Sequence, residues 1–456
     1  MSEERRLGLG EDDALREVYA AILDRAPEHD FDPTLDRVRE VCDLLGDPQR
    51  AFRVVHITGT NGKTSTARMI ERLIREHGLR TGLFTSPHLS SVTERIAVDG
   101  EPLSPERFVA LWQDVVPYIH MVDQRSQADG GPRMSFFEVL TVMAFAAFAD
   151  APVDVAVIEV GMGGVWDATN VADADIAVIT PISRDHERWL GHDLVDIAGE
   201  KAGIIKERSE LVLAEQRSEV DGVVLAAAAE RGVRVLREGV DLEVSTREVA
   251  VGGQVLALRT TGGLYTDIFL PLHGGHQAHN ALLALSTVEL LLRGGAALAG
   301  DAVEIAFGDA QAPGRLELVR TSPSILVDAA HNPAGVEALV AAVEEAFTFT
   351  RMVGVVGILA DKDAEQMLAG LEPLLDEIVI TRSGSPRSAD VDDLKAAAVE
   401  VFGADRVYAA DRLDDAIARA VDLAESADSR HASGAGVLVT GSITLVAEAR
   451  MLLGRR

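Results

Sequence analysis

The sequence has one cysteine, few aromatic residues and no long apolar run. Cys42 is the only thiol, so no intrachain disulfide can form, and a reducing, cytoplasmic compartment is expected. Aromatic residues make up 4% of the chain and hydrophobic residues 47%, which is typical of aliphatic cores in α/β proteins. We expect no membrane span, and no signal peptide within residues 1–17, because neither has the apolar stretch it requires.

Basic residues are scarce, and lysine is the scarcest of them. The 43 basic residues face 73 acidic ones, and the net charge of −30 argues against nucleic acid or membrane surfaces as partners. Only five of the basic residues are lysines. A chain that uses arginine as its general cation keeps lysine where guanidinium chemistry cannot substitute. Lys63 and Lys201 are therefore candidates for chemistry, whereas Lys395 is better explained as a chance survivor.

The segment VVHITGTNGKTS, residues 54–65, has the character of a phosphate-binding loop but not its usual length. The common pattern G-x-x-x-x-G-K-[ST] needs a glycine at the position of Ile57, and the chain has Gly59 instead. Loop N–H groups and the following helix N-terminus would bind phosphate oxygens. Lys63 would reach the β and γ phosphates, and Thr64 would offer its hydroxyl to Mg²⁺. The alternative is an ordinary turn between a strand and a helix.

Three ionisable residues downstream lie where an α/β protein binds ligands. Glu159 ends an apolar strand, where an isolated carboxylate is costly unless it is paired or metal-bound. His186 follows the next expected strand, which favours a metal role beside Glu159. Lys201, if burial neutralised its amine, could take up CO₂ and give a carbamate ligand for a hard cation. The alternatives are a strand-end cap for Glu159 and, for Lys201, a salt bridge to Glu200 or a neighbour.

Four residues further along the chain give weaker signals. Asn280 could hydrogen-bond an adenine edge, and Arg315 could contact a phosphate. Asp328 and His331 follow a strand end, which again is the ligand-binding edge of a parallel sheet. Taken singly, each is equally well explained as a cap or turn residue.

Strands and helices alternate along most of the chain, which predicts parallel sheets covered by helices. Residues 233–272 differ, because their short runs predict antiparallel strands, and the alternation restarts near residue 322. We therefore predict an α/β protein of two domains. Residues 1–310 form a P-loop NTPase-like parallel sheet domain with a small antiparallel β section. Residues 311–456 form a smaller Rossmann-like C-terminal α/β domain.

The motifs together, in this order, resemble the folylpolyglutamate synthase/dihydrofolate synthase family of the Mur ligase superfamily. The motifs are GTNGKTS, TSPHL, ERI, EVGMGGxWDATN, DH…LG, EKAGIIK, GHQxxN, PGR, DxAHNP, DKD and TGS, and the match runs from about residue 30 to 450. The resemblance implies an ATP-dependent acid–amino-acid ligase of folate biosynthesis and one-carbon metabolism. Such an enzyme adds L-glutamate to dihydropteroate, to folates, or to both through an acyl phosphate, with its active site between two domains.

The resemblance also implies roles for individual residues. ATP phosphates are expected at Gly59, Thr60, Asn61, Gly62, Lys63, Thr64 and Ser65, adenine at Asn280, and further ATP contacts at Arg315 and Asp328. Mg²⁺ is expected at Thr64, Ser86, Glu159 and His186, with Lys201 carbamylated and K⁺ as a further cation. Substrate contacts are expected at His331, Ser442 and Asp167, and catalytic roles at Lys63, Lys201, His186 and His331. The implied partners are folate or dihydropteroate, L-glutamate and ATP, bound by a monomer.

Four positions depart from the family pattern near the expected metal and substrate region. Val165 stands where the family usually has arginine, and Arg184, Glu187 and Arg188 surround His186 with charge. A ligase-like nucleotide-binding protein with lost or altered catalysis is therefore one alternative. Another Mur-type ligase is a second, although the short segment before the loop favours the folate branch over the peptidoglycan ligases.

Overall fold

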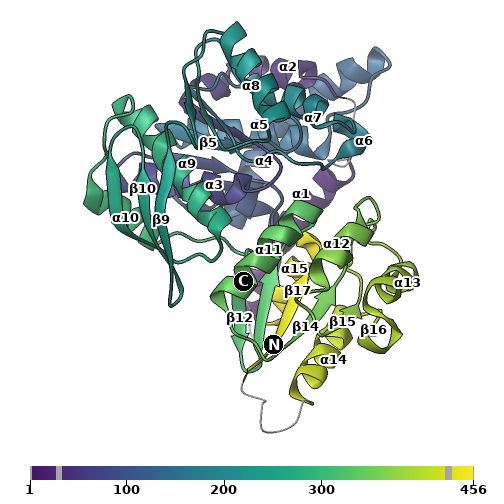
Figure 1. The fold of residues 1–456 in the computed structure, drawn as a ribbon. Coiled ribbons are helices and arrows are strands. Elements are labelled where there is room, and N and C mark those ends of the chain that lie inside the picture. Colours follow the sequence, from purple (N-terminus) through teal and green to yellow (C-terminus); the bar gives the residue numbers. More distant parts are fainter. Residues whose placement is uncertain (1–2, 27–32, 427–433, 455–456) are drawn as a thin grey trace. The chain divides into compact units, whose positions relative to one another are not determined.

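The computed structural model describes residues 3–26, 33–426 and 434–454 (Figure 1). The chain divides into two compact units. The first contains residues 1–245, 257–268 and 279–309, and the second contains residues 246–256, 269–278 and 310–456. The predicted domain bounds stay a prediction. Among the described helices, none is both long and apolar enough to cross a membrane.

The first unit is built on an eight-stranded sheet in the order β4-β3-β2-β5-β1-β6-β7-β8. The strands are β1 (Arg53–Thr58), β2 (Thr81–Phe84), β3 (Ile96–Val98), β4 (Glu101–Pro102), β5 (Val155–Glu159), β6 (Ile176–Ile179), β7 (Glu210–Leu213) and β8 (Val235–Arg237). The central strand β1 pairs in parallel with β5 and β6, so the carboxyl ends of all three meet at one edge. Only β3 and β4 at one margin run antiparallel to their neighbours.

The helices of this unit are α1 (Glu3–Leu23), α2 (Asp36–Leu44), α3 (Lys63–Glu76), α4 (Pro105–Ala128), α5 (Phe136–Asp150), α6 (Glu187–Leu190), α7 (Leu194–Ala202), α8 (Ser218–Glu230), α9 (Gly275–Arg293) and α10 (Gly300–Gly308). The first turn of α9 is assigned to the second unit. Helix α5 packs on β1, β2 and β5 in one apolar core, and α7 and α8 pack on β6 and β7 in another. His56 pairs with Ile158 of the first core and with Ala177 of the second. Because paired residues of parallel strands point to the same face, both cores lie on one face of the sheet.

A three-stranded sheet interrupts the alternation, as the sequence predicted. Its strands are β9 (Glu243–Ala250), β10 (Gly253–Arg259) and β11 (Leu264–Leu270), in the order β11-β10-β9. Short turns join neighbouring strands, so each consecutive pair is an antiparallel hairpin. Its residues are divided between the two units.

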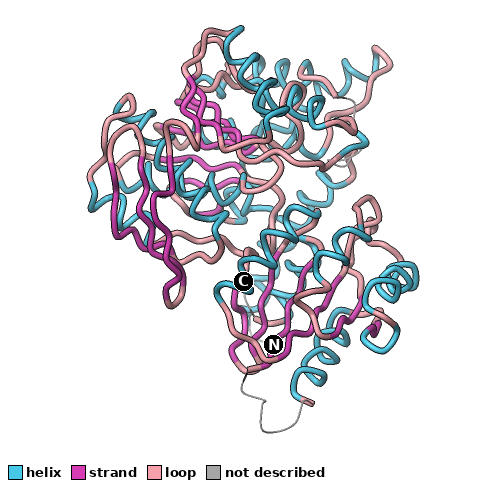
Figure 2. Tube along the Cα trace, viewed as in Figure 1, coloured by secondary structure: helices cyan, strands magenta, loops and turns pink. Residues whose placement is uncertain are grey.

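The second unit has a six-stranded sheet in the order β12-β13-β17-β14-β15-β16, drawn in magenta in Figure 2. Its strands are β12 (Glu317–Thr321), β13 (Ser324–Asp328), β14 (Arg351–Val356), β15 (Glu377–Ile380), β16 (Val407–Ala409) and β17 (Ala435–Thr440). Its helices are α11 (Pro333–Ala346), α12 (Ala364–Leu371), α13 (Val391–Phe402), α14 (Leu413–Glu425) and α15 (Ile443–Leu452). All strands are parallel except β12, which confirms the predicted Rossmann-like character.

Two buried ion pairs attach the N-terminal segment to the first unit. The Arg37 guanidinium on α2 lies 3.0 Å from the Glu138 carboxylate on α5, and both side chains are almost fully buried. The Arg25 guanidinium likewise lies 2.9 Å from the buried carboxylate of Asp123 on α4. Removing one partner of such a pair leaves an uncompensated charge in the core, so these contacts hold the helices in place.

We predict that Arg37→Met lowers the free energy of unfolding of the first unit by about 3–5 kcal/mol, because Glu138 is then left buried and unpaired. Urea unfolding followed by circular dichroism measures the change. The matched control is Arg39→Met on the same helix, whose partner Asp36 is exposed, and it should shift stability by less than about 0.5 kcal/mol. Equal effects of the two substitutions would contradict the prediction.

Candidate active site

The shortened glycine loop joins β1 to α3 and is packed too closely for any other residue at its two glycines. Gly59 has a φ of 146°, and a Cβ there would lie 1.9 Å from Thr180 Oγ1. Gly62 has a φ of 89°, and a Cβ there would lie 2.6 Å from Asn280 Oδ1. Both positions therefore need glycine for backbone conformation and for space. The loop is a constrained structure, not an accidental turn.

The segment after β6 holds the loop in place. The Thr60 N–H donates to the Pro181 carbonyl at 2.9 Å, and the Thr60 hydroxyl donates to the Ser183 carbonyl at 2.9 Å. Asn61 completes the loop, and Ser65 is buried in the first turn of α3. The loop conformation is thus fixed by residues more than a hundred positions away in the chain.

Lys63 begins α3 and lies across the loop. Its Nζ donates to the Gly59 carbonyl at 3.1 Å and to the Thr60 carbonyl at 3.0 Å. A cation fixed over a turn that precedes a helix N-terminus gives a site suited to phosphate.

Three of the residues predicted to bind metal lie together beside the loop. The Thr64 hydroxyl lies 2.9 Å from each carboxylate oxygen of Glu159, and the Ser86 N–H donates to the same carboxylate at 3.2 Å. Glu159 is 1% exposed at the end of β5. A buried carboxylate with an adjacent hydroxyl presents the hard oxygen ligands that Mg²⁺ prefers, so these residues fit the ion.

Lys201 on α7 contacts the same loop, although it lies far downstream in the sequence. Its buried Nζ donates to the Gly59 carbonyl at 2.8 Å. Burial and, to a smaller extent, the nearby charge of Lys63 lower the pKa of Lys201 to about 7. A substantial share of neutral amine at neutral pH is what carbamate formation requires. The predicted alternative was a salt bridge to Glu200 or a neighbour. No ion pair of Lys201 occurs in the described structure, although the charges of Asp185, Asp167 and Glu200 act on it from a greater distance.

His186 precedes α6 on the loop after β6, in a left-handed conformation with φ of 53°. Its Nε2 lies 4.0 Å from the Asp185 carboxylate, and its side chain is partly exposed. The charged neighbours have contacts of their own. Glu187 accepts a hydrogen bond from His192 at 2.7 Å, and the Arg188 guanidinium lies over the Trp189 ring.

No group of three or more His, Cys, Asp or Glu side chains forms a metal cluster in the described ranges. The predicted set contains only two residues of those types, Glu159 and His186, so this observation does not test it. Its remaining oxygen ligands come from hydroxyls and from the proposed carbamate.

The segment that carries Val165 is anchored through its backbone. The Val165 N–H donates to the Glu200 carbonyl at 3.1 Å, and Asn170 Nδ2 donates to the Val165 carbonyl at 3.0 Å. A Cβ at Gly164 would lie 2.4 Å from the Glu200 carbonyl oxygen, so the segment lies directly against α7. The Val165 side chain is 46% exposed. The departure from arginine therefore leaves the local backbone intact.

Asp167 lies at the end of this segment, and its carboxylate is a buried hydrogen-bond acceptor. Its carboxylate accepts hydrogen bonds from the Met162 N–H at 2.9 Å and from the Thr169 N–H at 3.0 Å. Burial raises the pKa of Asp167 to about 6 in spite of these bonds. The carboxylate thus organises the turn and also lies in the electrostatic field of Lys201.

The candidates of the second unit lie at the carboxyl edge of its sheet. Asp328 is buried at the end of β13 and accepts from the Leu316 and Ala330 N–H groups, each at 2.8 Å. Burial raises the pKa of Asp328, and the neighbouring charge of Arg315 opposes that rise. His331 Nδ1 lies 2.9 Å from the Ala329 carbonyl oxygen.

Ser442 makes the contact expected of a helix cap. Its hydroxyl accepts from the Leu445 N–H at 3.2 Å at the start of α15. Asp328 and Ser442 therefore both have a structural role, and for Asp328 this is the predicted alternative of a cap or turn residue.

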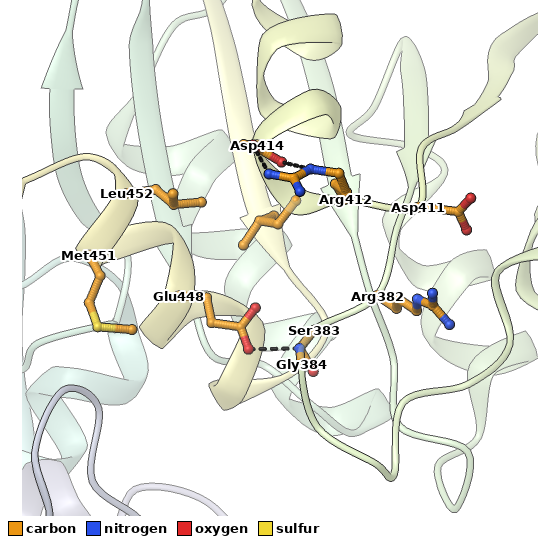
Figure 3. Close-up of a pocket in the computed structure, with 10 residues that line it drawn as sticks. Arg382, Ser383, Gly384, Asp411, Arg412, Asp414, Glu448, Met451 and Leu452 are labelled. Carbon is orange, nitrogen blue, oxygen red and sulfur yellow. Dashed lines mark hydrogen bonds and ion pairs between the residues drawn. The ribbon is translucent and has the colours of Figure 1, made fainter.

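A separate pocket of about 510 Å³ lies in the second unit, beside the loops that follow β15 and β16 (Figure 3). It is lined by Arg382, Ser383, Gly384, Asp411, Arg412, Leu413, Asp414, Glu448, Met451 and Leu452. Arg412 pairs with Asp414, and Glu448 accepts from the Gly384 N–H. None of the predicted site residues lines this pocket, so it is not the candidate active site.

Sequence reasoning missed residues that hold the site together. Thr180 limits the space at Gly59, and His56 and Thr169 connect β1 to Asp167. The one available signal was a histidine inside the otherwise apolar strand RVVHIT.

Comparison with known families identifies the class of protein. The Mur ligase middle domain matches residues 110–288, and the Mur ligase glutamate ligase domain matches residues 314–443. The chain is therefore built from Mur ligase domains.

Comparison with whole proteins defines the family. Dihydrofolate synthase/folylpolyglutamate synthase of Mycobacterium tuberculosis is 50% identical over 97% of this chain and 94% of its own length. The protein of the same name from Bacillus subtilis is 35% identical, over 92% of this chain and 95% of its own. Folylpolyglutamate synthase from M. tuberculosis, solved with ADP and AMPPCP, matches with a TM-score of 0.93 at 50% identity over 98% and 99% of the two chains.

This chain belongs to the dihydrofolate synthase/folylpolyglutamate synthase family. A folylpolyglutamate synthase complex with AMPPCP and folate also matches, with a TM-score of 0.81 at 29% identity over 96% and 99% of the two chains. The predicted family, α/β fold class and enzyme class, an ATP-dependent ligase, are confirmed.

We predict that Gly59→Ala and Gly62→Ala each weaken ADP binding about tenfold or more, because a methyl group at either position collides with its neighbours. Isothermal titration calorimetry measures the dissociation constant. The control is Gly78→Ala at the other end of α3, which has a φ of 78° but no atom within 4 Å of the added methyl. The prediction fails if Gly78→Ala weakens binding as much as the loop variants do.

Proposed function

We propose that this protein joins L-glutamate to dihydropteroate, to a folate, or to both, using ATP and passing through an acyl phosphate. The observation that carries the proposal is the meeting of two lysines and a carboxylate at the phosphate loop. Lys63 and Lys201 both donate to the Gly59 carbonyl, and Thr64 beside them contacts Glu159. The names of the relatives and the folate complex support the choice of acceptor.

The reaction needs positioning and charge neutralisation more than covalent catalysis. An oxygen of the acceptor carboxylate attacks the γ-phosphorus of ATP, ADP leaves, and an acyl phosphate forms. The amine of glutamate then attacks the acyl carbon, phosphate leaves, and the amine loses a proton. Loop N–H groups and Lys63 stabilise the negative charge that moves between phosphate oxygens in the first step.

Mg²⁺ is proposed to bind at Thr64, Ser86, Glu159 and His186, where it would neutralise phosphate charge. Lys201 is proposed to be carbamylated, since its amine is buried beside the loop with a pKa lowered to about 7. The carbamate would add a further anionic oxygen to the hydroxyl and carboxylate already in contact. K⁺ is proposed as a second cation, without assigned ligands.

The remaining assignments follow the family motifs. Asn280 is proposed to contact adenine, and its carboxamide lies against Gly62. Arg315 and Asp328 are proposed to contact ATP, with His331 and Ser442 on the glutamate side. Asp167 is proposed to contact substrate. We further propose a cytoplasmic monomer whose partners are these small molecules, and neither nucleic acid nor a membrane.

Three of the four departures from the family pattern have contacts outside the phosphate loop. Val165 is held through its backbone, and Glu187 and Arg188 contact His192 and Trp189. The contacts of the phosphate loop with Lys201 do not involve these side chains. This supports catalysis over a protein that only binds nucleotide.

We predict that phosphate release requires the acceptor and glutamate together. The purified protein is incubated with ATP, Mg²⁺ and L-glutamate, with dihydropteroate or a reduced folate in parallel reactions, and phosphate is measured. Each omission of acceptor or glutamate should bring the rate to background, and comparison of the two acceptors identifies the activity. ADP binding without glutamate-dependent phosphate release would contradict the proposal.

We predict that Lys201→Arg lowers kcat roughly 100-fold, because arginine cannot form the carbamate and keeps a charge beside Lys63. The matched control is Lys206→Arg, which loses a half-buried lysine whose Nζ donates to the Asn170 carbonyl. It should change kcat by less than about threefold. Carbon-13 NMR with labelled bicarbonate should show a carbamate signal that Lys201→Arg removes. Full activity of Lys201→Arg would show that the carbamate role is wrong.

A further inference from the structure

A fully buried histidine lies inside the central strand of the first unit. His56 is 0% exposed, and its Nε2 lies 2.8 Å from the Thr169 hydroxyl in the short helix η3 (Ala168–Val171). The Thr169 hydroxyl in turn donates a hydrogen bond to the Asp167 carboxylate. A continuous chain of three side chains thus runs from β1 to the segment that lies against α7.

The hydrogen bonds fix the direction of this chain. Thr169 has one hydroxyl proton, and the ionised carboxylate of Asp167 receives it, so the Thr169 oxygen must accept from His56 Nε2. Burial, reinforced by the charge of Lys206, lowers the pKa of His56 to about 3, so the ring is neutral and carries one proton. That proton is on Nε2. The buried Nδ1 has no hydrogen-bond partner in the described structure.

The unpaired Nδ1 shows that this histidine is costly in its place. An apolar side chain would suit a site between the apolar strands β5 and β6, and it would avoid burying an unsatisfied ring nitrogen. Compared with an apolar side chain, the imidazole therefore lowers the stability of the fold, but it provides one directed hydrogen bond to Thr169.

The same face of β1 holds the neighbouring segment at a second point. The Thr58 hydroxyl donates to the Gly163 carbonyl at 2.8 Å, two residues along the strand from His56. The segment between these anchors lies against the backbone of α7 at Glu200 and Lys201. Movement of the segment would therefore change the surroundings of Lys201.

We propose that His56 is a positioning residue for the ligase reaction: through Thr169 it holds Asp167, and with it residues 161–167, in place against Lys201. The inference rests on the proposed function and deepens it. His56 touches neither nucleotide nor acceptor in this role. It acts through the donor at Nε2, so another side chain with a donor at that position should replace it.

The kinetic test compares donor and non-donor variants. His56→Gln retains an N–H near the position of Nε2, whereas His56→Leu and Thr169→Val break the chain at its two links. For the two broken variants we expect kcat/KM for the acceptor to fall about 10- to 100-fold, as displacement of a positioned group does. KM for ATP should change less than about twofold, since the phosphate loop is anchored by Thr60. His56→Gln should recover most of the lost rate.

The double variant His56→Leu/Thr169→Val tests whether the two residues act as one chain. Its loss should be no greater than that of either single variant, because the second substitution has nothing further to disrupt. Thr169→Val also keeps the test valid if His56→Leu does not fold. Additive losses would show that the two side chains act independently and would overturn the proposal.

Val54→Ala serves as the matched control. Val54 is buried on the same face of β1, two residues from His56, and belongs to the apolar core under α5. Its truncation should lower the melting temperature while leaving kcat/KM within about twofold. If His56→Leu likewise lowers the melting temperature alone, His56 is only structural. If the native protein shows no glutamate-dependent turnover, the proposed function fails instead.

The tautomer gives a readout independent of activity. Nitrogen-15 NMR of histidine-labelled protein should show, between pH 7 and 8, a neutral imidazole that is protonated at Nε2 and whose signal His56→Gln removes. In Thr169→Val the same signal should shift, because the acceptor of the N–H is lost. A ring protonated at Nδ1 would overturn the proposal.

Discussion

Two lysine side chains donate to one backbone carbonyl, that of Gly59, and the organisation of the site depends on this contact. Two ammonium groups so close together repel each other, and burial disfavours the charge of the deeper one. Burial and, to a smaller extent, the nearby charge of Lys63 lower the pKa of Lys201 to about 7. The Gly59 carbonyl, which follows β1, thus brings the amine of Lys201 next to the lysine that begins α3.

The sequence predicted well those features that repeat locally or follow from sheet topology. Alternating strands and helices gave the two parallel sheets, and the apolar strand before Glu159 placed that carboxylate at the edge occupied by the phosphate loop. Thr64, Ser86 and Glu159 lie together because parallel strands bring their carboxyl ends to one edge. The motifs identified the family because eleven short segments matched in order, although each alone was ambiguous.

Other features depend on contacts between distant residues and could not be predicted. Thr60 donates hydrogen bonds to Pro181 and Ser183, which lie more than a hundred residues away in the chain. No local sequence pattern predicts these contacts. The chain from His56 to Asp167 depends on where η3 packs against β1. Val165 stands where the family usually has arginine, and this departure left lost or altered catalysis open as an alternative. The structure shows a backbone-anchored residue with an outward side chain, which sequence comparison alone does not reveal.

The contact between Gly62 and Asn280 joins two distant parts of the chain. The Asn280 carboxamide on α9 lies so close to Gly62 that a methyl group added there would collide with it. A side chain at position 62 would therefore require the Asn280 side chain to move. A residue more than two hundred positions away thus helps to limit which residues the phosphate loop can contain.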